Sequence, residues 1–142
     1  MTQDYDELAK ELLSLNLNML HVPAKRKIGK MAQGEVFVLN YLATHQQSAH
    51  PGELSKSMVV SSARLAALLG RMEEKQLISR TQDPLNNRQV IVTLLPAGQA
   101  VIDRIRAEVL AAAARMLERL GPEDAREYLR IQRKILSNSV SA

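Results

Sequence analysis

The sequence of 142 residues contains no cysteine and no tryptophan. The absence of cysteine excludes disulfides, thiolate metal sites and thiol redox sensing in this chain. Aromatic residues make up 3% of the sequence, with three tyrosines and one phenylalanine. A folded core must therefore be built from Leu, Ile, Val, Ala and Met, which favours helices packed on helices over a sheet sandwich.

A secretion signal and long apolar runs are also missing. The first seven residues are acidic and have no apolar segment, which disfavours a signal peptide. The most apolar stretch, residues 109–117, is interrupted by Arg115 and is too short to span a bilayer. We therefore expect a cytoplasmic protein that has no membrane partner.

Residue groupings typical of enzymes are not found. No serine–histidine–aspartate grouping stands out, and no glycine-rich phosphate loop is present. The three histidines, His21, His45 and His50, lack the close helical pairing that metal sites favour. We therefore expect no enzymatic activity, no metal and no cofactor.

Basic residues are in modest excess. The sequence has 19 Lys and Arg against 15 Asp and Glu, a net charge of +4 and a pI near 9.6. This balance favours an acidic partner such as nucleic acid. The densest basic run, residues 25–30, is interpreted first as a solvated linker, with contact to DNA or to an acidic ligand as the alternative.

The apolar periodicity predicts a mainly α chain with one β-hairpin. Helices are predicted over residues 4–21, 34–45, 51–58, 61–75, 96–120 and from 122 onwards, and strands over 77–82 and 89–94. Residues 83–88 are rich in turn formers and are expected to form the loop between the strands. The long helix is expected to carry Met116 and Leu120 on its apolar face, and the last helix to bury Ile131 and Ile135.

The order of these elements is more informative than any one of them. A short helix, a tight link at Val59 and Val60 and a second helix make a helix-turn-helix, and a hairpin directly afterwards makes it winged. The fold class is therefore a winged helix-turn-helix core flanked by N- and C-terminal helices. We expect residues 1–142 to form a single domain, with the winged lobe at residues 33–96.

The helix after the tight link has the properties of a DNA reader. Its N-terminus attracts phosphate, and Ser61 and Ser62 add hydroxyl groups there. Arg64 is the best candidate for a guanine edge, because a guanidinium bonds O6 and N7 together. The face opposite the leucine stripe is otherwise small, so readout of DNA shape is expected to contribute. The candidate residues on this helix are Ser61, Ser62, Ala63, Arg64, Ala67 and Arg71.

The hairpin tip offers a second contact. Arg88 has the side chain that narrow minor grooves attract. Asn86 and Asn87 are candidates for bonds to phosphate or to the hairpin backbone itself, with a solvated turn as the equal alternative.

The terminal helices indicate a second copy of the chain. Residues 1–22 and 97–142 hold more apolar surface than a compact reader of this size covers. A two-fold dimer through these helices would bury that surface and place two reading helices about one DNA turn apart, matching a near-palindromic operator.

Four segments together resemble the MarR family of bacterial transcription regulators. They are residues 50–58 (HPGELSKSM), 60–62 (VSS), 68–80 (LLGRMEEKQLISR) and 83–98 (DPLNNRQVIVTLLPAG). The resemblance implies an obligate homodimer joined by its terminal helices, a reading helix at residues 61–75 and a wing arginine at Arg88. It also implies a repressor that a small aromatic or phenolic effector releases from DNA. Candidate pocket residues taken from the resemblance are His21, Met31 and Tyr41.

The sequence departs from the family pattern at three places. Asn86 stands where an aspartate commonly precedes the wing arginine, so an ion pair bracing Arg88 is absent. Pro96 replaces the threonine that usually leads into the long helix. Ala67 and Gly70 stand in the reading helix where polar residues are frequent.

A protein-docking winged helix is the alternative function. In that case the alanine face would bind a protein partner instead of DNA. Residues 61–90 carry five basic and three acidic side chains, a balance of +2, which is a mild bias towards DNA.

Overall fold

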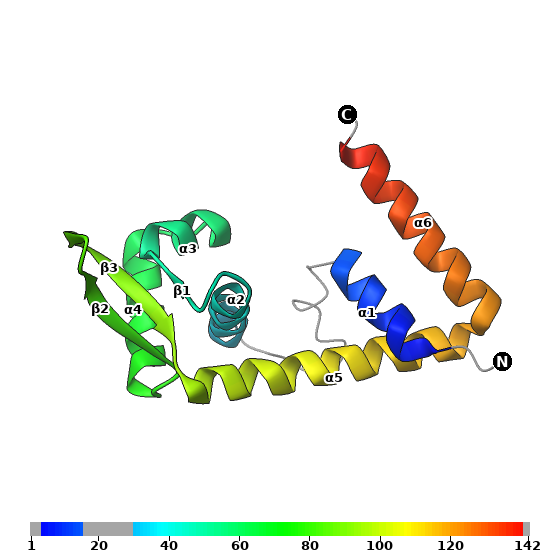
Figure 1. The fold of residues 1–142 in the computed structure, drawn as a ribbon, viewed down its shortest axis with the longest axis horizontal. Coiled ribbons are helices and arrows are strands. Elements are labelled where there is room, and N and C mark those ends of the chain that lie inside the picture. The colour runs from blue at the N-terminus through cyan, green and yellow to red at the C-terminus, as the bar shows by residue number, and fades with distance from the viewer. Residues whose placement is uncertain (1–3, 16–29, 141–142) are drawn as a thin grey trace. The chain divides into compact units, whose positions relative to one another are not determined.

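The computed structural model describes residues 4–15 and 30–140 (Figure 1). In chain order the elements are α1 (Tyr5–Leu15), α2 (Lys30–Thr44), β1 (Ser48–Ala49), α3 (Pro51–Met58), α4 (Ser62–Glu74), β2 (Ile78–Asp83), β3 (Asn86–Leu94), α5 (Pro96–Leu120) and α6 (Pro122–Val140). The prediction of a mainly α fold with a small β-hairpin is confirmed. The last third of the predicted first helix, residues 16–21, lies outside the described residues, and α2 begins four residues earlier than expected.

The chain divides into two compact units, and α5 contributes to both. Residues 23–104 form the winged unit, which contains α2, α3, α4, the sheet and the start of α5. Residues 1–22 and 105–142 form the helical unit, which contains α1, the rest of α5 and α6. None of the helices in the described segments combines the length and apolar character of a membrane span.

The winged unit is organised around an aliphatic core. Leucines on one side of α4 face this core, as their helical spacing predicts. Gly34 on α2 allows α4 to approach closely, since a Cβ there would lie 3.1 Å from the Leu68 side chain. The fully buried side chains of the unit are Val38, Leu39, Leu42, Leu54, Leu65, Leu69, Met72, Ile78, Val92 and Ile102.

Three antiparallel strands form a sheet in the order β1-β3-β2. The hairpin pairs from Ile78 opposite Leu94 to Asp83 opposite Asn86, which leaves a two-residue turn. The loop predicted over residues 83–88 is therefore too long, because pairing across the turn extends the ladder to its tip. β1 was not predicted, since a two-residue strand shows no alternation.

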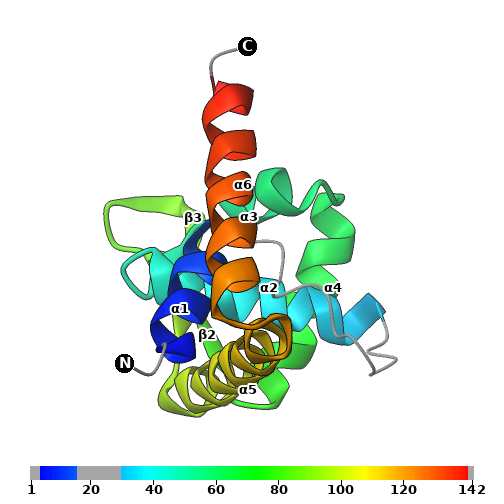
Figure 2. The same cartoon turned by 90° about the vertical axis from the view of Figure 1, so that its right-hand side faces the viewer.

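The link between α3 and α4 is strained. Val59 adopts a left-handed conformation with φ 56° and ψ 51°, and its side chain is 89% exposed. Such a conformation is unfavourable for a β-branched residue. Its backbone N–H bonds to the Ser55 carbonyl, which closes the end of α3. This tight link lets α3 and α4 run in different directions, as both Figure 1 and Figure 2 show.

The helical unit has a smaller core. Its buried residues alternate small and large side chains: Ala9, Leu12, Ala113, Leu117, Ala125 and Leu129. Glu11 of α1 and Arg133 of α6 form an ion pair within this unit. The small alanine side chains permit close approach of the helices. The larger leucine side chains supply most of the apolar area that is buried here.

Two burial predictions for this unit are wrong within the single chain. Met116 and Leu120 on α5 are 37% and 42% exposed, and Ile131 and Ile135 on α6 are 43% and 55% exposed. For α5 the error arises because residues 109–117, apart from Arg115, are apolar around the helix, so periodicity does not select one face. For α6, periodicity identifies the apolar face but not whether the same chain covers it.

Candidate nucleic-acid interface

The α4 helix presents two opposite faces. Leu65, Leu68, Leu69 and Met72 are buried against the winged unit. The predicted reading residues Ser61, Ser62, Ala63, Arg64 and Ala67 are all exposed. The structure thus brings these five candidates to one accessible surface at the N-terminal half of the helix.

The N-terminus of α4 begins as the sequence indicates. The Ser61 Oγ accepts a hydrogen bond from the Arg64 backbone N–H at 3.2 Å. Such a cap stabilises a helix by about 1 kcal/mol. The Ser61 hydroxyl is therefore already engaged as an acceptor, and it keeps its O–H for donation to a phosphate. Ser62 is the first helical residue and lies beside it.

Two of the basic side chains of the reading helix and the wing are paired with acids. Lys75 pairs with Glu35 of α2 at 2.8 Å, and Arg80 pairs with Glu73 of α4 at 3.0 Å. The hydrogen bond from the Arg80 side chain lowers the pKa of Glu73, and the Arg80 backbone N–H lowers it further. Within the described part of the chain, no ion pair is found for Arg64, Arg71 and Arg88.

Arg71 differs from the other two. It is half-buried, and its Nε is buried without a hydrogen-bond partner in the described structure. Together with Arg64 it lines a hollow beside α4 that Gly34, Met58 and Val60 also border. Both arginines thus lie on the same side of the helix, as the helical spacing predicts.

The wing tip is solvent-exposed. Arg88, Asn86 and Asn87 lie at the start of β3 and all three are exposed. The Asn86 Oδ1 accepts a hydrogen bond from the Arg88 backbone N–H at 3.1 Å. Of the roles left open for Asn86, a bond to the hairpin backbone is therefore the one that the structure contains. This bond orders the segment that carries Arg88 without the usual ion pair.

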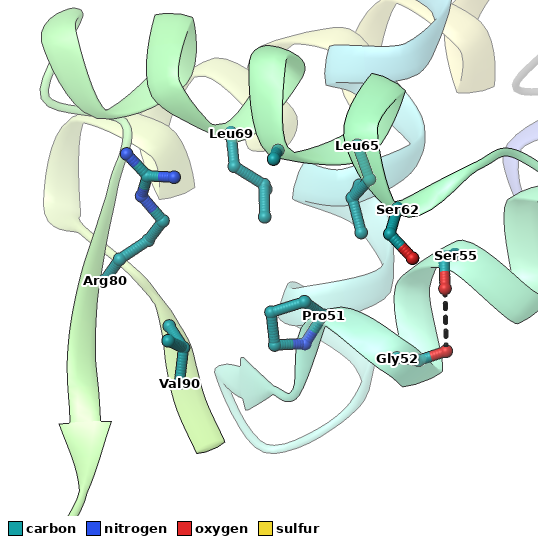
Figure 3. Close-up of a pocket in the computed structure, with 9 residues that line it drawn as sticks. Pro51, Gly52, Ser55, Ser62, Leu65, Leu69, Arg80 and Val90 are labelled. Carbon is teal, nitrogen blue, oxygen red and sulfur yellow. Dashed lines mark hydrogen bonds between the residues drawn. The ribbon is translucent and has the colours of Figure 1, made fainter. Parts of the chain in front are cut away.

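A cleft separates the reading helix from the wing strands. It has about 210 Å³ of accessible space. Figure 3 shows Leu65 and Leu69 from α4 lining one side, with Pro51 and Val90 on the other and Arg80 at one end. The side chains along the cleft are mainly apolar. The charge of Arg80 at its end is already neutralised, because Arg80 is paired with Glu73.

Sequence reasoning missed a cluster where the tip of the wing hairpin meets the start of α3. His50, the residue before α3, has Nε2 3.0 Å from Asp83 Oδ2 and Nδ1 3.2 Å from Glu53 Oε1. Hydrogen bonds that the His50 ring donates to the Asp83 and Glu53 carboxylates raise the pKa of His50. The spacing of His50 and Glu53 is that of a capping box, but no sequence signal connects either residue with Asp83.

The three candidate pocket residues are described unevenly. His21 lies outside the described residues, and the Met31 side chain is also outside them. Tyr41 is half-buried on α2, where its hydroxyl donates to Glu53 Oε2 at 3.4 Å and its ring stacks on His45. A pocket formed by His21, Met31 and Tyr41 therefore stays a prediction.

Comparison with known proteins gives consistent matches. Residues 33–90 match the MarR family. An HTH-type transcriptional regulator of Bacillus subtilis, YsmB, is 35% identical over 54 residues, which is 38% of this chain and 37% of that protein. The transcriptional repressor Rv2887 of Mycobacterium tuberculosis is 28% identical over 102 residues, 72% of this chain and 73% of the repressor.

Solved structures show the same fold. The YusO protein of Bacillus subtilis has a TM-score of 0.68 and 24% identity, covering 92% of this chain and 90% of YusO. MepR, a transcription regulator of the multidrug efflux pump MepA of Staphylococcus aureus, has a TM-score of 0.69 and 19% identity, covering 97% of this chain and 98% of MepR.

These matches agree with the element order, the exposed α4 face and the winged hairpin. The relatives are named as a transcriptional regulator and a transcriptional repressor, which agrees with the expectation that the chain is not an enzyme. Over residues 33–90 the chain is therefore similar to the MarR family, and it shares the winged helix-turn-helix fold of these solved structures.

Proposed function

We propose that this protein is a homodimeric repressor that binds a near-palindromic double-stranded DNA operator. The observation that carries the proposal is the exposed α4 surface with exposed Arg64 and half-buried Arg71 on one side of it, followed directly by a wing whose tip exposes Arg88. In this proposal residues 1–142 act as a single domain in the cytoplasm. Residues 33–96 form the DNA-binding lobe, and residues 1–22 and 97–142 form the dimer interface.

The α4 helix enters the major groove in this proposal. Arg64 bonds a guanine edge, Arg71 bonds the backbone, and Ser61 and Ser62 donate to phosphate at the helix N-terminus. Exposed Ala63 and Ala67 let the helix approach closely and touch thymine methyls. Support comes from the solved MepR variant described as bound to an oligodeoxyribonucleotide, which has a TM-score of 0.60.

The wing makes the second contact in this proposal. Arg88 enters the adjacent minor groove, where A·T tracts are narrow and attract arginine. Asn87, exposed beside it, bonds phosphate, while Asn86 orders the turn. The two contacts together would read a half-site.

Dimerisation follows from the exposed apolar side chains of the helical unit. Five large ones lie on two helices of this unit: Met116, Leu120, Ile131, Ile135 and Leu136. A second copy of the chain is the occupant that a two-fold operator requires.

A repressor role and an effector are the finer parts of the proposal. The relative Rv2887 is named a repressor, and MepR is named a regulator of a multidrug efflux pump. We expect a small aromatic or phenolic effector that lowers operator affinity, with His21, Met31 and Tyr41 as pocket candidates.

The proposal is tested by fluorescence anisotropy with DNA from the protein's own upstream region and with a scrambled duplex, at several salt concentrations. We expect tight binding to the first, weak binding to the second and a steep salt slope. Equal, weak binding to both would contradict sequence-specific reading and would favour the protein-docking alternative for the alanine face.

A variant pair assigns the reading role. Arg64→Ala is expected to lower specific affinity by about 1–3 kcal/mol, because a bidentate base contact is lost. Lys56→Ala removes one positive charge from an exposed position on α3, outside the reading helix and the proposed dimer interface, and serves as the control. Equal losses in the two variants would mean that Arg64 contributes only general electrostatic attraction.

A further inference from the structure

His50 lies between two carboxylates of the winged unit. Its Nε2 is 3.0 Å from Asp83 Oδ2, and its Nδ1 is 3.2 Å from Glu53 Oε1. A neutral imidazole has one N–H and donates to one acceptor, whereas an imidazolium donates to both. The presence of an acceptor at each nitrogen therefore fits a protonated His50.

Asp83 carries this contact into the hairpin turn. Its residue is 7% exposed, and it is the buried polar residue found in the described part of the chain. Its Oδ2 faces His50, while its Oδ1 accepts a hydrogen bond from the Leu85 backbone N–H at 2.9 Å. After the turn, Asn86 Oδ1 accepts from the Arg88 backbone N–H. Hydrogen bonds thus connect the residue before α3 with the β2–β3 turn as far as Leu85, and a separate bond between Asn86 and the Arg88 backbone lies directly after that turn.

We propose that His50 is a positioning residue for the wing: its imidazolium, held by Glu53 and Asp83, fixes the hairpin tip against the helix-turn-helix, so that the DNA contact of Arg88 depends on the protonation of His50. This inference rests on the proposed DNA-binding function. It goes beyond that function because it makes operator affinity depend on pH through one residue that does not itself touch DNA.

The titratable groups around His50 come from three elements. The hydrogen bond that His50 donates to Asp83 is the largest cause that raises the pKa of His50 above its ordinary value of 6.5, and the one to Glu53 is the second. The contact with His50 in turn lowers the pKa of Asp83, and the His50 backbone N–H lowers the pKa of Glu53. From α2, Tyr41 donates to Glu53, and His45 stacks on the Tyr41 ring with 3.8 Å between centroids.

The direction of the pH effect follows from these shifts. Because folding raises the pKa of His50, its contribution is complete below about pH 6.5 and is lost as the pH rises through the raised value. The carboxylates act in the opposite sense, because folding lowers their pKa values. Their contribution is lost only as the pH falls below the ordinary pKa values, 3.8 for Asp83 and 4.5 for Glu53. The hydrogen-bonded group of His50, Glu53 and Asp83, called the clamp below, is therefore strongest in mildly acidic solution.

The test measures operator affinity at constant ionic strength between about pH 5.5 and about pH 8.5. We expect the wild-type protein to lose roughly three- to tenfold in affinity across this range, the net effect of about one ordinary hydrogen bond. His50→Gln keeps a hydrogen-bonding side chain that does not titrate, and it is expected to abolish the pH dependence. A pH-independent wild type, or a His50→Gln variant that retains the full slope, overturns the inference.

Two controls identify the route. The double variant of the other histidines, His21→Gln with His45→Gln, is expected to keep the pH dependence. Arg88→Ala is expected to remove it, because the clamp acts through the wing arginine. If Arg88→Ala retains the full slope, His50 acts elsewhere, by its own charge or through α4, and the positioning role is wrong.

A measurement without DNA separates this inference from the proposed function. In the free protein, the backbone amide NMR signals of Leu85 and Arg88 are expected to shift with pH at the midpoint at which the His50 ring titrates. Asp83→Asn, which keeps an acceptor for the Leu85 N–H, is expected to uncouple the two. Coincident midpoints with no DNA binding would refute the proposed function and retain the clamp, whereas unrelated midpoints overturn the clamp.

Discussion

The two units of this protein differ in how completely each buries its apolar side chains. In the winged unit the large exposed ones are isolated at a link, a turn and the outer wing: Val59, Leu85 and Val90. In the helical unit they occur together on α5 and α6, from Met116 to Leu136, around a core of only six buried residues.

The difference shows which unit is complete in one chain. A winged unit that satisfies its own core needs no partner to fold, and its exposed features are available for contact with DNA. A helical unit that leaves several large side chains in water is stabilised by covering them, at about 25 cal/mol per Å² of apolar surface removed from solvent. We therefore expect substitutions in the helical unit to change assembly and substitutions in the winged unit to change folding or recognition.

The largest effect is expected from a charged pair in the helical unit. Leu120→Glu with Ile131→Glu is expected to dissociate the dimer, because each side chain contributes about 1.5–3 kcal/mol when buried and a two-fold interface contains each twice. Sedimentation velocity at micromolar concentration measures the result. Leu85→Glu makes the same kind of change at the 95% exposed wing tip and is expected to leave the dimer intact. An intact dimer in the double variant would contradict the assignment of this face.

The next effect tests how tightly the winged unit is packed. A Cβ at Gly98 would lie 2.2 Å from the Leu77 carbonyl oxygen and 2.8 Å from the Leu94 side chain. Gly98→Ala is therefore expected to lower the free energy of unfolding by about 1–3 kcal/mol, as overpacking does. Gly52→Ala on α3 meets nothing within 4 Å and is the matched control, with no loss expected in thermal or urea denaturation. A neutral Gly98→Ala would mean that the start of α5 shifts freely.

Recognition by the wing is expected to be more modest. Arg88→Ala should weaken binding by roughly 1 kcal/mol, most strongly on operators with A·T-rich flanks, because a narrow minor groove attracts arginine. Anisotropy with A·T-rich and G·C-rich flanks at fixed salt measures this. A loss that does not depend on the flank would reduce Arg88 to a backbone contact.

The smallest effect concerns the strained link. Val59→Gly is expected to change stability by less than about 1 kcal/mol, because relief of the left-handed strain is offset by greater freedom of the unfolded chain. Val59→Asn, which tolerates this conformation better than valine, is expected to be stabilising. A large loss in Val59→Asn would show that the exposed valine makes a contact that the single chain does not contain.

The sequence alone determined the element order and the reading helix. Prolines at helix starts, the Ser61 cap and the leucine stripe of α4 are local signals, so the boundaries of α3, α4 and α5 were predictable to within a residue. The exposure of Arg64 followed from the helical periodicity of α4, and that of Arg88 from its place among turn-forming residues.

Tertiary structure decided what depends on residues far apart in sequence. It selected which face of α5 is buried, because alanine-rich helices have no unique apolar stripe and the contacts with α1 and α6 choose one. The tertiary structure also paired Lys75 with Glu35 and Arg80 with Glu73, so these two basic side chains are neutralised locally. It also brought His50 to Asp83 across 33 positions, a contact that local pattern cannot encode because the pairing of β2 with β3 and the packing of α3 create it.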